Sequence, residues 1–222
     1  MSEPGAEASS RFTTPTREDA EVEFNRIVAF SDGVFAIAIT LLVLTLEVPG
    51  GADDLGQELR DRTDEFLAYG LSFAVLGKLW LSHHRFYGSL GRFDGALLGL
   101  NLLYLAFIAL VPFTSDLLGN YSGESVAVIA YALNLAAVSL VFTISVRYAS
   151  GHDLVRESAK AHVTRFAGWS DFFIAGVFLI SIPVALVSPT AATLVWLGVF
   201  LGGRRLADAM TGDRRPAGGR QG

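Results

Sequence analysis

Residues 26–44 read RIVAFSDGVFAIAITLLVL, and this stretch decides the fold. It is long and apolar enough for a helix that crosses a bilayer, which needs about 20 residues. Further apolar runs follow it, and together they predict six spans, at residues 27–48, 65–81, 96–115, 125–146, 170–187 and 189–203. The last run is short for a span. We therefore expect an all-α membrane protein with six transmembrane helices per subunit.

The composition agrees with a membrane protein. The chain has 222 residues, of which 51% are hydrophobic and 18% are charged, whereas soluble domains have about 25% charged residues. Only Asp32 and Lys78 interrupt the interiors of the predicted spans. Six spans use roughly 120 residues, which leaves no segment for a separate extramembrane domain. We expect a disordered cytoplasmic tail at 1–22, a six-helix transmembrane domain at 23–206, and a second disordered cytoplasmic tail at 207–222.

Several classes of function are excluded or disfavoured. The chain has no cysteine and a net charge of −5, which excludes thiol chemistry and gives no sign of a nucleic-acid partner. The spans hold no His-Glu-x-x-His, paired-Asp or Gly-x-Ser-x-Gly element, so we expect no enzyme. His83 and His84 are adjacent and point about 100° apart, and His152 and His162 lie in a distant loop, so we expect no metal site. We also expect no cofactor and no small-molecule ligand.

Basic residues predict the orientation. The N-terminal tail, the second connection, the fourth connection and the C-terminal tail hold three, two, four and five Lys and Arg residues. The opposite side holds only Arg60 and Arg62 when Lys78 is set aside. Because basic residues accumulate on the cytoplasmic side of membrane proteins, this distribution places both termini in the cytoplasm.

The first helix has two different faces. At about 100° per residue, four side chains fall within one arc of roughly 100°, namely Ile37, Thr40, Leu41 and Leu44. Asp32 points away from that arc. The aliphatic ladder has two interpretations, which are ordinary helix packing and a hydrophobic ring that gates a pore by excluding water.

Asp32 needs an explanation, because a carboxylate inside a membrane helix is costly unless it is paired or hydrated. Arg26 is its nearest cation in sequence. Ser31 and Asp32 can act as interhelical hydrogen-bonding groups. Alternatively, Asp32 is the proton-relay carboxylate of a proton- or cation-coupled secondary transporter. Such transporters commonly have helices broken at mid-membrane, whereas we expect an unbroken first helix with its polar group near one end.

The same residues carry a family resemblance. Arg26-x-x-x-Phe30-Ser31-Asp32, followed by an aliphatic helix ending in Glu47-Val48-Pro49, resembles the signature of the transmembrane protein 175 family of potassium channels in its bacterial single-repeat form. Further matching elements follow in order, and these are Trp80, His83-His84-Arg85, Asn101 and Pro112-Phe113-Thr114. The resemblance is densest over residues 26–121.

The resemblance implies a potassium-permeable channel that conducts passively and lacks the Thr-Val-Gly-Tyr-Gly filter of ordinary potassium channels. In this family the first helix of each repeat lines the pore. Ile37 matches the narrowest layer, Leu41 and Leu44 match the layers above it, and Thr40 matches a threonine layer linked to selectivity. The other matching positions imply a structural motif and an interhelical network, made of Arg26, Phe30, Ser31, Asp32, Trp80, His83, His84 and Asn101. We expect one of the two histidines, with Trp80 and Asn101, to contact Ser31 or Asp32.

The stoichiometry follows from the count of pore helices. The chain has a single Phe-Ser-Asp copy, and one helix cannot enclose a pore. The family's four-repeat pore therefore implies a homotetramer, since closed symmetric assemblies are the usual solution. We expect this tetramer in the plasma membrane, with the lipid bilayer around it and K+ as the permeant ion.

Overall fold

The structure is a computed structural model that describes residues 17–46, 55–166, 170–193 and 195–196. The regular elements in these residues are helices, and no strand is formed there beyond one isolated bridge. In chain order they are α1 (Arg17–Leu41), η1 (Leu42–Thr45), α2 (Leu55–Asp61), α3 (Thr63–Gly88), α4 (Gly95–Ala109), α5 (Val111–Asn120), α6 (Ser125–Gly151), α7 (Glu157–Phe166) and α8 (Ser170–Val187).

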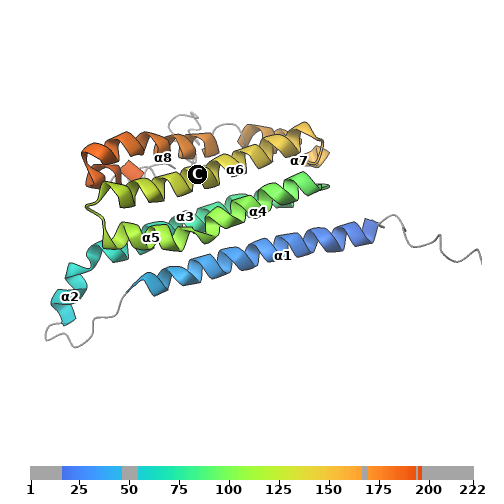
Figure 1. Ribbon diagram of the computed structural model, residues 1–222. Helices are drawn as coiled ribbons and strands as arrows, with labels where there is room; N and C mark the ends of the chain where they lie inside the picture. The colour runs from blue at the N-terminus through green and yellow to red at the C-terminus, as the bar shows by residue number, and fades with distance from the viewer. Residues whose placement is uncertain (1–16, 47–54, 167–169, 194, 197–222) are drawn as a thin grey trace, which may run out of the picture.

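The long helices pack as a bundle in which α1 lies on one side and α8 on the other (Figure 1). α3, α4 and α5 lie between α1 and α6, and α6 packs against α8. The core side chains are apolar and almost fully enclosed, for example Leu42, Leu76, Ile108 and Val128. α1 is therefore attached to the bundle along one of its faces only.

The first helix differs in two ways from the expected single helix. After Leu41 the backbone tightens into the 3₁₀ turn η1, in which the Thr45 hydroxyl donates to the Leu42 carbonyl at 2.8 Å. Such turns are common where a helix ends, and the prediction of one unbroken α-helix is corrected to this extent. At the other end α1 begins at Arg17, within the stretch expected as a tail. Residues 1–16, 47–48 and 207–222 lie outside the described residues.

The third predicted span consists of two helices. α4 ends at Ala109, α5 begins at Val111, and Pro112 occupies the first turn of α5. Proline has no backbone N–H to donate to the preceding turn and its ring crowds the carbonyl four residues earlier, so the helix is interrupted at this point.

Three stretches of the described residues are helical, long and apolar enough to cross a membrane, namely Glu21–Thr45, Gly95–Asn120 and Ser125–Gly151. α3 has the length of a span, but Lys78 and the His83-His84 pair make its sequence more polar. Gly176–Val187 is apolar but shorter. Most of the sixth predicted span lies outside the described residues. The membrane character thus has structural support, and the count of six spans stays a prediction.

Candidate pore face and its anchor

The two faces of α1 have opposite environments. Ser31, Phe35, Ala38 and Leu42 are buried against the bundle, and their spacing of three and four residues is that of one helix face. On the other face, the exposed fractions are 60% for Ile37, 41% for Leu41 and 74% for Leu44. The sequence-predicted ladder is therefore an apolar stripe that the described part of the subunit leaves uncovered.

Thr40 lies on the same exposed face. Its hydroxyl donates to the Ile37 carbonyl at 2.9 Å, which is the local back-bond that threonine commonly makes inside helices. The hydroxyl proton is used in this way, while the oxygen can still accept a hydrogen bond or approach a cation. Thr40 therefore adds a hydroxyl group to an otherwise apolar stripe.

Asn101 connects three helices from the buried side. Its Nδ2 donates to Ser31 Oγ of α1 at 3.0 Å, and its Oδ1 lies 2.9 Å from Nε2 of His83 on α3. Because an amide oxygen only accepts, the His83 Nε2 must carry the proton in this arrangement. Ser31 Oγ donates in turn to the Ile27 carbonyl at 2.9 Å. Asn101, Ser31 and His83 are each no more than 1% exposed, so this network fixes α1 against α3 and α4.

Asp32 has a separate partner on α3. Nε1 of Trp80 donates to Asp32 Oδ1 at 2.8 Å, and Asp32 is half-buried. Arg26, its nearest cation in sequence, is exposed and forms no ion pair with Asp32 in the described structure. The carboxylate is therefore held by a neutral indole N–H.

The two adjacent histidines have different surroundings. His83 is stacked on Tyr87 and Tyr104, with ring centroids 4.2 and 5.5 Å apart. His84 is exposed and contacts only the Trp80 ring among the described ring contacts, at 5.5 Å. The hydrogen-bond network therefore includes His83 and leaves His84 outside.

Phe30 also lies outside the network. It is 55% exposed, and it precedes Ile37 by seven residues, which is about two helical turns. Phe30 therefore lies on the same side of α1 as Ile37, away from Ser31. No group of three His, Cys, Asp or Glu side chains that could hold a metal ion occurs in the described residues.

A second buried polar cluster was not anticipated from the sequence. Ser72 Oγ of α3 donates to Ser115 Oγ of α5 at 2.8 Å and lies 3.0 Å from the Tyr131 hydroxyl of α6. All three residues are buried. The available signal was that single hydroxyls inside apolar runs need partners, since buried polar groups are nearly always hydrogen-bonded. Which hydroxyls meet depends on how the helices pack.

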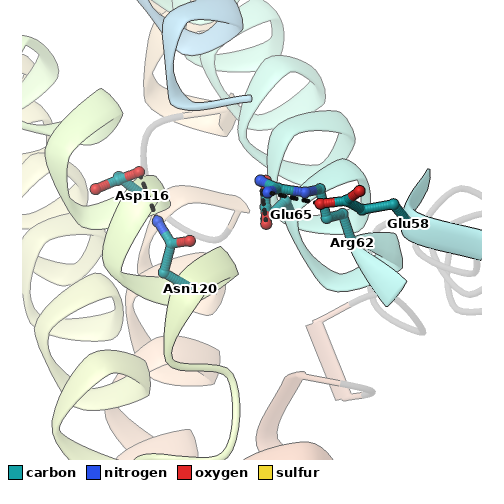
Figure 2. Close-up of polar contacts among 5 residues, drawn as sticks. All are labelled: Glu58, Arg62, Glu65, Asp116 and Asn120. Carbon is teal, nitrogen blue, oxygen red and sulfur yellow. Dashed lines mark hydrogen bonds and ion pairs between the residues drawn. The ribbon is translucent and has the colours of Figure 1, made fainter. Parts of the chain in front are cut away.

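Charged and polar side chains contact one another near the first turn of α3 and near the end of α5 (Figure 2). Arg62 lies between two carboxylates, at 3.9 Å from Glu58 and 3.5 Å from Glu65. On α5, Asn120 Nδ2 donates to Asp116 Oδ1 at 2.9 Å. The two ion pairs of Arg62 join partly buried side chains, and they offset part of the negative charge of Glu58 and Glu65.

Comparison with known proteins adds a family match. The family described as endosomal/lysosomal potassium channel TMEM175 matches residues 26–112. This range contains the exposed stripe of α1, all of α3 and α4, and the first two residues of α5. Every residue of the Asn101 network and of the Asp32–Trp80 pair therefore falls inside the match.

Three relatives illustrate the range of similarity. A Streptomyces collinus protein named as a potassium channel is 42% identical over 126 residues, which are 54% of this chain and 61% of the relative. A Chamaesiphon minutus protein, also named as a potassium channel, is 35% identical over 185 residues, or 80% of this chain and 88% of the relative. A human protein named endosomal/lysosomal proton channel TMEM175 is 37% identical over 120 residues, or 50% of this chain and 23% of the relative.

A solved structure resembles the whole fold. The crystal structure of a lysosomal potassium-selective channel TMEM175 homolog from Chamaesiphon minutus matches with a TM-score of 0.73 and 30% sequence identity. The match covers 86% of this chain and 99% of that chain.

Proposed function

The chain belongs to the TMEM175 family of potassium channels, and from this premise we propose that it conducts K+ passively across a membrane. The family comprises membrane-embedded ion channels and not enzymes. The observation that carries the proposal is the exposed stripe of α1, in which Ile37, Leu41 and Leu44 are uncovered while the opposite face is anchored. We assign this stripe to the pore wall.

A pore requires several copies of the chain, because each subunit supplies one α1. Four copies related by a four-fold axis would place four such stripes around a common channel, and closed symmetric assemblies are the usual form of homo-oligomers. The homotetramer is therefore part of the proposal. So are six spans within residues 23–206, cytoplasmic tails at 1–22 and 207–222, cytoplasmic termini and a plasma-membrane location.

The pore wall would combine an apolar constriction with one polar layer. A ring of four Ile37 side chains forms the narrowest layer, with Leu41 and Leu44 beyond it. Apolar constrictions gate by excluding water, so a hydrated K+ crosses only when this ring widens or wets. Thr40 follows Ile37 by almost one turn and offers hydroxyl oxygens that can replace water around the ion. No cofactor is involved, and K+ is the transported ion.

The anchor keeps the stripe facing the axis. Ser31 is held by Asn101, and Asp32 is held by Trp80. The two contacts use different faces of α1, so α1 resists rotation about its own axis. We assign Ser31, Asp32, Trp80, His83 and Asn101 to this positioning role. Arg26, Phe30 and His84 share the family motif but are exposed in the subunit.

The proposal is tested by ion flux in liposomes that contain the purified full-length protein. Wild-type protein is expected to let K+ flow down its own concentration gradient when no proton or Na+ gradient is present. Ile37→Asn should raise the K+ flux by about tenfold, because a decrease of about 1.4 kcal/mol in the dewetting barrier has that effect on a rate. Leu103→Asn is the matched control, since Leu103 is an exposed apolar residue of α4 and lies off the stripe. Equal fluxes in the two variants would refute the assignment of the pore face.

The same liposomes distinguish the alternatives. A secondary transporter that uses Asp32 requires K+ flux that stops without a proton or Na+ gradient. The human relative is named a proton channel. A proton channel requires that an imposed voltage acidifies the liposome interior, with a proton flux larger than the K+ flux. K+ flux that proceeds at the same rate with and without a proton gradient or a Na+ gradient supports the passive channel.

A further inference from the structure

Two connections meet at the end of the bundle where α1 begins (Figure 1). One is the turn between α3 and α4, and the other joins α6 to α7. Leu90 and Val155 form an antiparallel bridge, Gly91 N donates to the Leu154 carbonyl at 2.8 Å, and Arg156 N donates to the Ser89 carbonyl at 3.0 Å. We call residues 89–94 and 152–156 the loop pair. These backbone bonds make the loop pair one fixed unit.

Two arginines of the loop pair are positioned by backbone carbonyls. Arg156 Nε donates to the Leu90 carbonyl at 2.9 Å, and Arg92 Nη2 donates to the Asp153 carbonyl at 3.4 Å. A Cβ on Gly91 would lie 3.1 Å from Arg156 Cγ, so glycine allows the Arg156 stem to pass close to the turn. Both side chains are exposed, and each guanidinium keeps further N–H donors for another partner.

The carboxylates near the loop pair form hydrogen bonds or ion pairs with groups other than Arg92 and Arg156. Asp94 accepts from Leu97 N at 2.9 Å and from the Tyr148 hydroxyl at 2.8 Å. Asp153 and Glu157 both pair with Lys160, at 3.0 and 2.8 Å. None of the ion pairs in the described residues involves Arg92 or Arg156. Asp94 and Asp153 balance the formal charge of the loop pair, and Asp153 interacts electrostatically with Lys160 and, more weakly, with Arg92. The guanidinium groups of Arg92 and Arg156 nevertheless lack a direct ion pair in the described residues and can bind a further anion.

Two more arginines flank the loop pair. Arg85 lies in the last turn of α3 and Arg147 lies about one turn before the end of α6, and both are exposed. Within the described part of the chain neither pairs with a carboxylate. On α6, the exposed apolar residues Leu140 and Ile144 lie on the same face as Arg147, at helical spacing. A path of apolar surface thus leads along α6 to the basic end.

We propose that this end of the subunit binds the phosphate headgroup of an anionic phospholipid. Arg92 and Arg156 are its direct ligands, because a guanidinium matches two phosphate oxygens at once. Arg85 and Arg147 add positive potential at headgroup depth, where basic clusters attract anionic lipids. The Leu140–Ile144 surface suits an acyl chain, and this favours a lipid over a soluble phosphate. The inference goes beyond ion conduction and does not depend on it.

The test measures thermal stability of the full-length protein in nanodiscs of phosphatidylcholine, with and without phosphatidylglycerol. For the wild type, phosphatidylglycerol should raise the Tm by about 5 °C, as expected for a ligand well above its Kd. Arg92→Gln combined with Arg156→Gln should abolish this shift. Arg60→Gln is the matched control, because Arg60 is an exposed arginine on α2 whose guanidinium contacts Gln57, and it should keep the full shift.

A second variant covers the case in which loss of the loop-pair contacts prevents folding. Arg85→Gln with Arg147→Gln removes side chains that have no hydrogen bond or ion pair in the described structure, and it should lower the shift by about half. An undiminished shift in both double variants would overturn the proposal. So would inorganic phosphate, if it reproduced the full shift in phosphatidylcholine discs, because the ligand would then be a free anion.

Discussion

Replacing Asn101 by leucine removes the residue that joins α1 to α3 and α4. The change keeps a side chain of similar size and deletes both hydrogen bonds of the amide. Ser31 loses the 3.0 Å bond from Nδ2 but keeps its bond to the Ile27 carbonyl. His83 loses the acceptor that lies 2.9 Å from Nε2, and its N–H is left buried.

The expected cost follows from these two losses. Side-chain hydrogen bonds between membrane helices contribute about 0.6 kcal/mol on average and up to about 1.7 kcal/mol. A buried donor left without a partner costs about 1–3 kcal/mol. Because Ser31 stays partly satisfied, the His83 N–H dominates the cost. We expect Asn101→Leu to lower the free energy of unfolding by about 2 kcal/mol.

The measurement is an equilibrium unfolding experiment in bicelles or mild detergent, and the chain offers a matched control. Asn134 is also buried, but its Nδ2 makes one long bond of 3.4 Å to Thr114, and its Oδ1 has no hydrogen-bond partner in the described structure. Asn134→Leu should therefore cost less than about 0.5 kcal/mol or stabilise the protein. If both leucine variants lost the same stability, the Asn101 network would not be the anchor that we describe.

Three further predictions concern other parts of the bundle. Trp80→Phe should cost about 1–2 kcal/mol of unfolding free energy, because it deletes the N–H donor of Asp32, and an unchanged denaturation midpoint would contradict this. Gly119→Ala should lower the Tm, because its Cβ would lie 3.1 Å from the backbone of α3, whereas Gly99→Ala meets no atom within 4 Å and should be neutral or stabilising. The hydrogen bonds from a backbone N–H of α4 and a tyrosine hydroxyl lower the pKa of Asp94. The ionised carboxylate therefore stabilises the fold fully above the ordinary aspartate pKa of about 4, and this stabilisation is lost as the pH falls further. Asp94→Asn should therefore weaken the acid-induced decrease in Tm as the pH falls below about 4, and identical pH profiles would refute the assignment.

The sequence predicts the two faces of α1 well, and the reason is geometric. A helix turns by about 100° per residue wherever it forms, so the relation of Ile37 to Leu41 and Leu44 depends on local structure alone. The burial of Ser31 and Phe35 on the opposite side follows from the same rotation. In the proposed tetramer the exposed stripe faces other copies of the chain, and the structure of one chain does not contain them.

The parts that the sequence left open depend on packing between helices. His83 and His84 are adjacent residues of the same type. Only the rotation of α3 relative to α4 makes His83 the partner of Asn101. The pairing of Ser72 with Ser115 is undetermined for the same reason. Pro112 is visible in the sequence, but membrane helices often tolerate proline, so the break before α5 was not predicted.

The most direct test of the pore face uses a single introduced thiol, because the chain has no cysteine of its own. Ile37→Cys and Ala38→Cys differ by one position, yet Ile37 is 60% exposed and Ala38 is 2% exposed. K+ current through each variant is recorded in a planar bilayer before and after a membrane-impermeant, positively charged thiol reagent. If the exposed face of α1 lines the pore, the reagent blocks most of the current in Ile37→Cys and leaves Ala38→Cys unchanged. A current through Ile37→Cys that persists after its thiol has been shown to react would contradict the account.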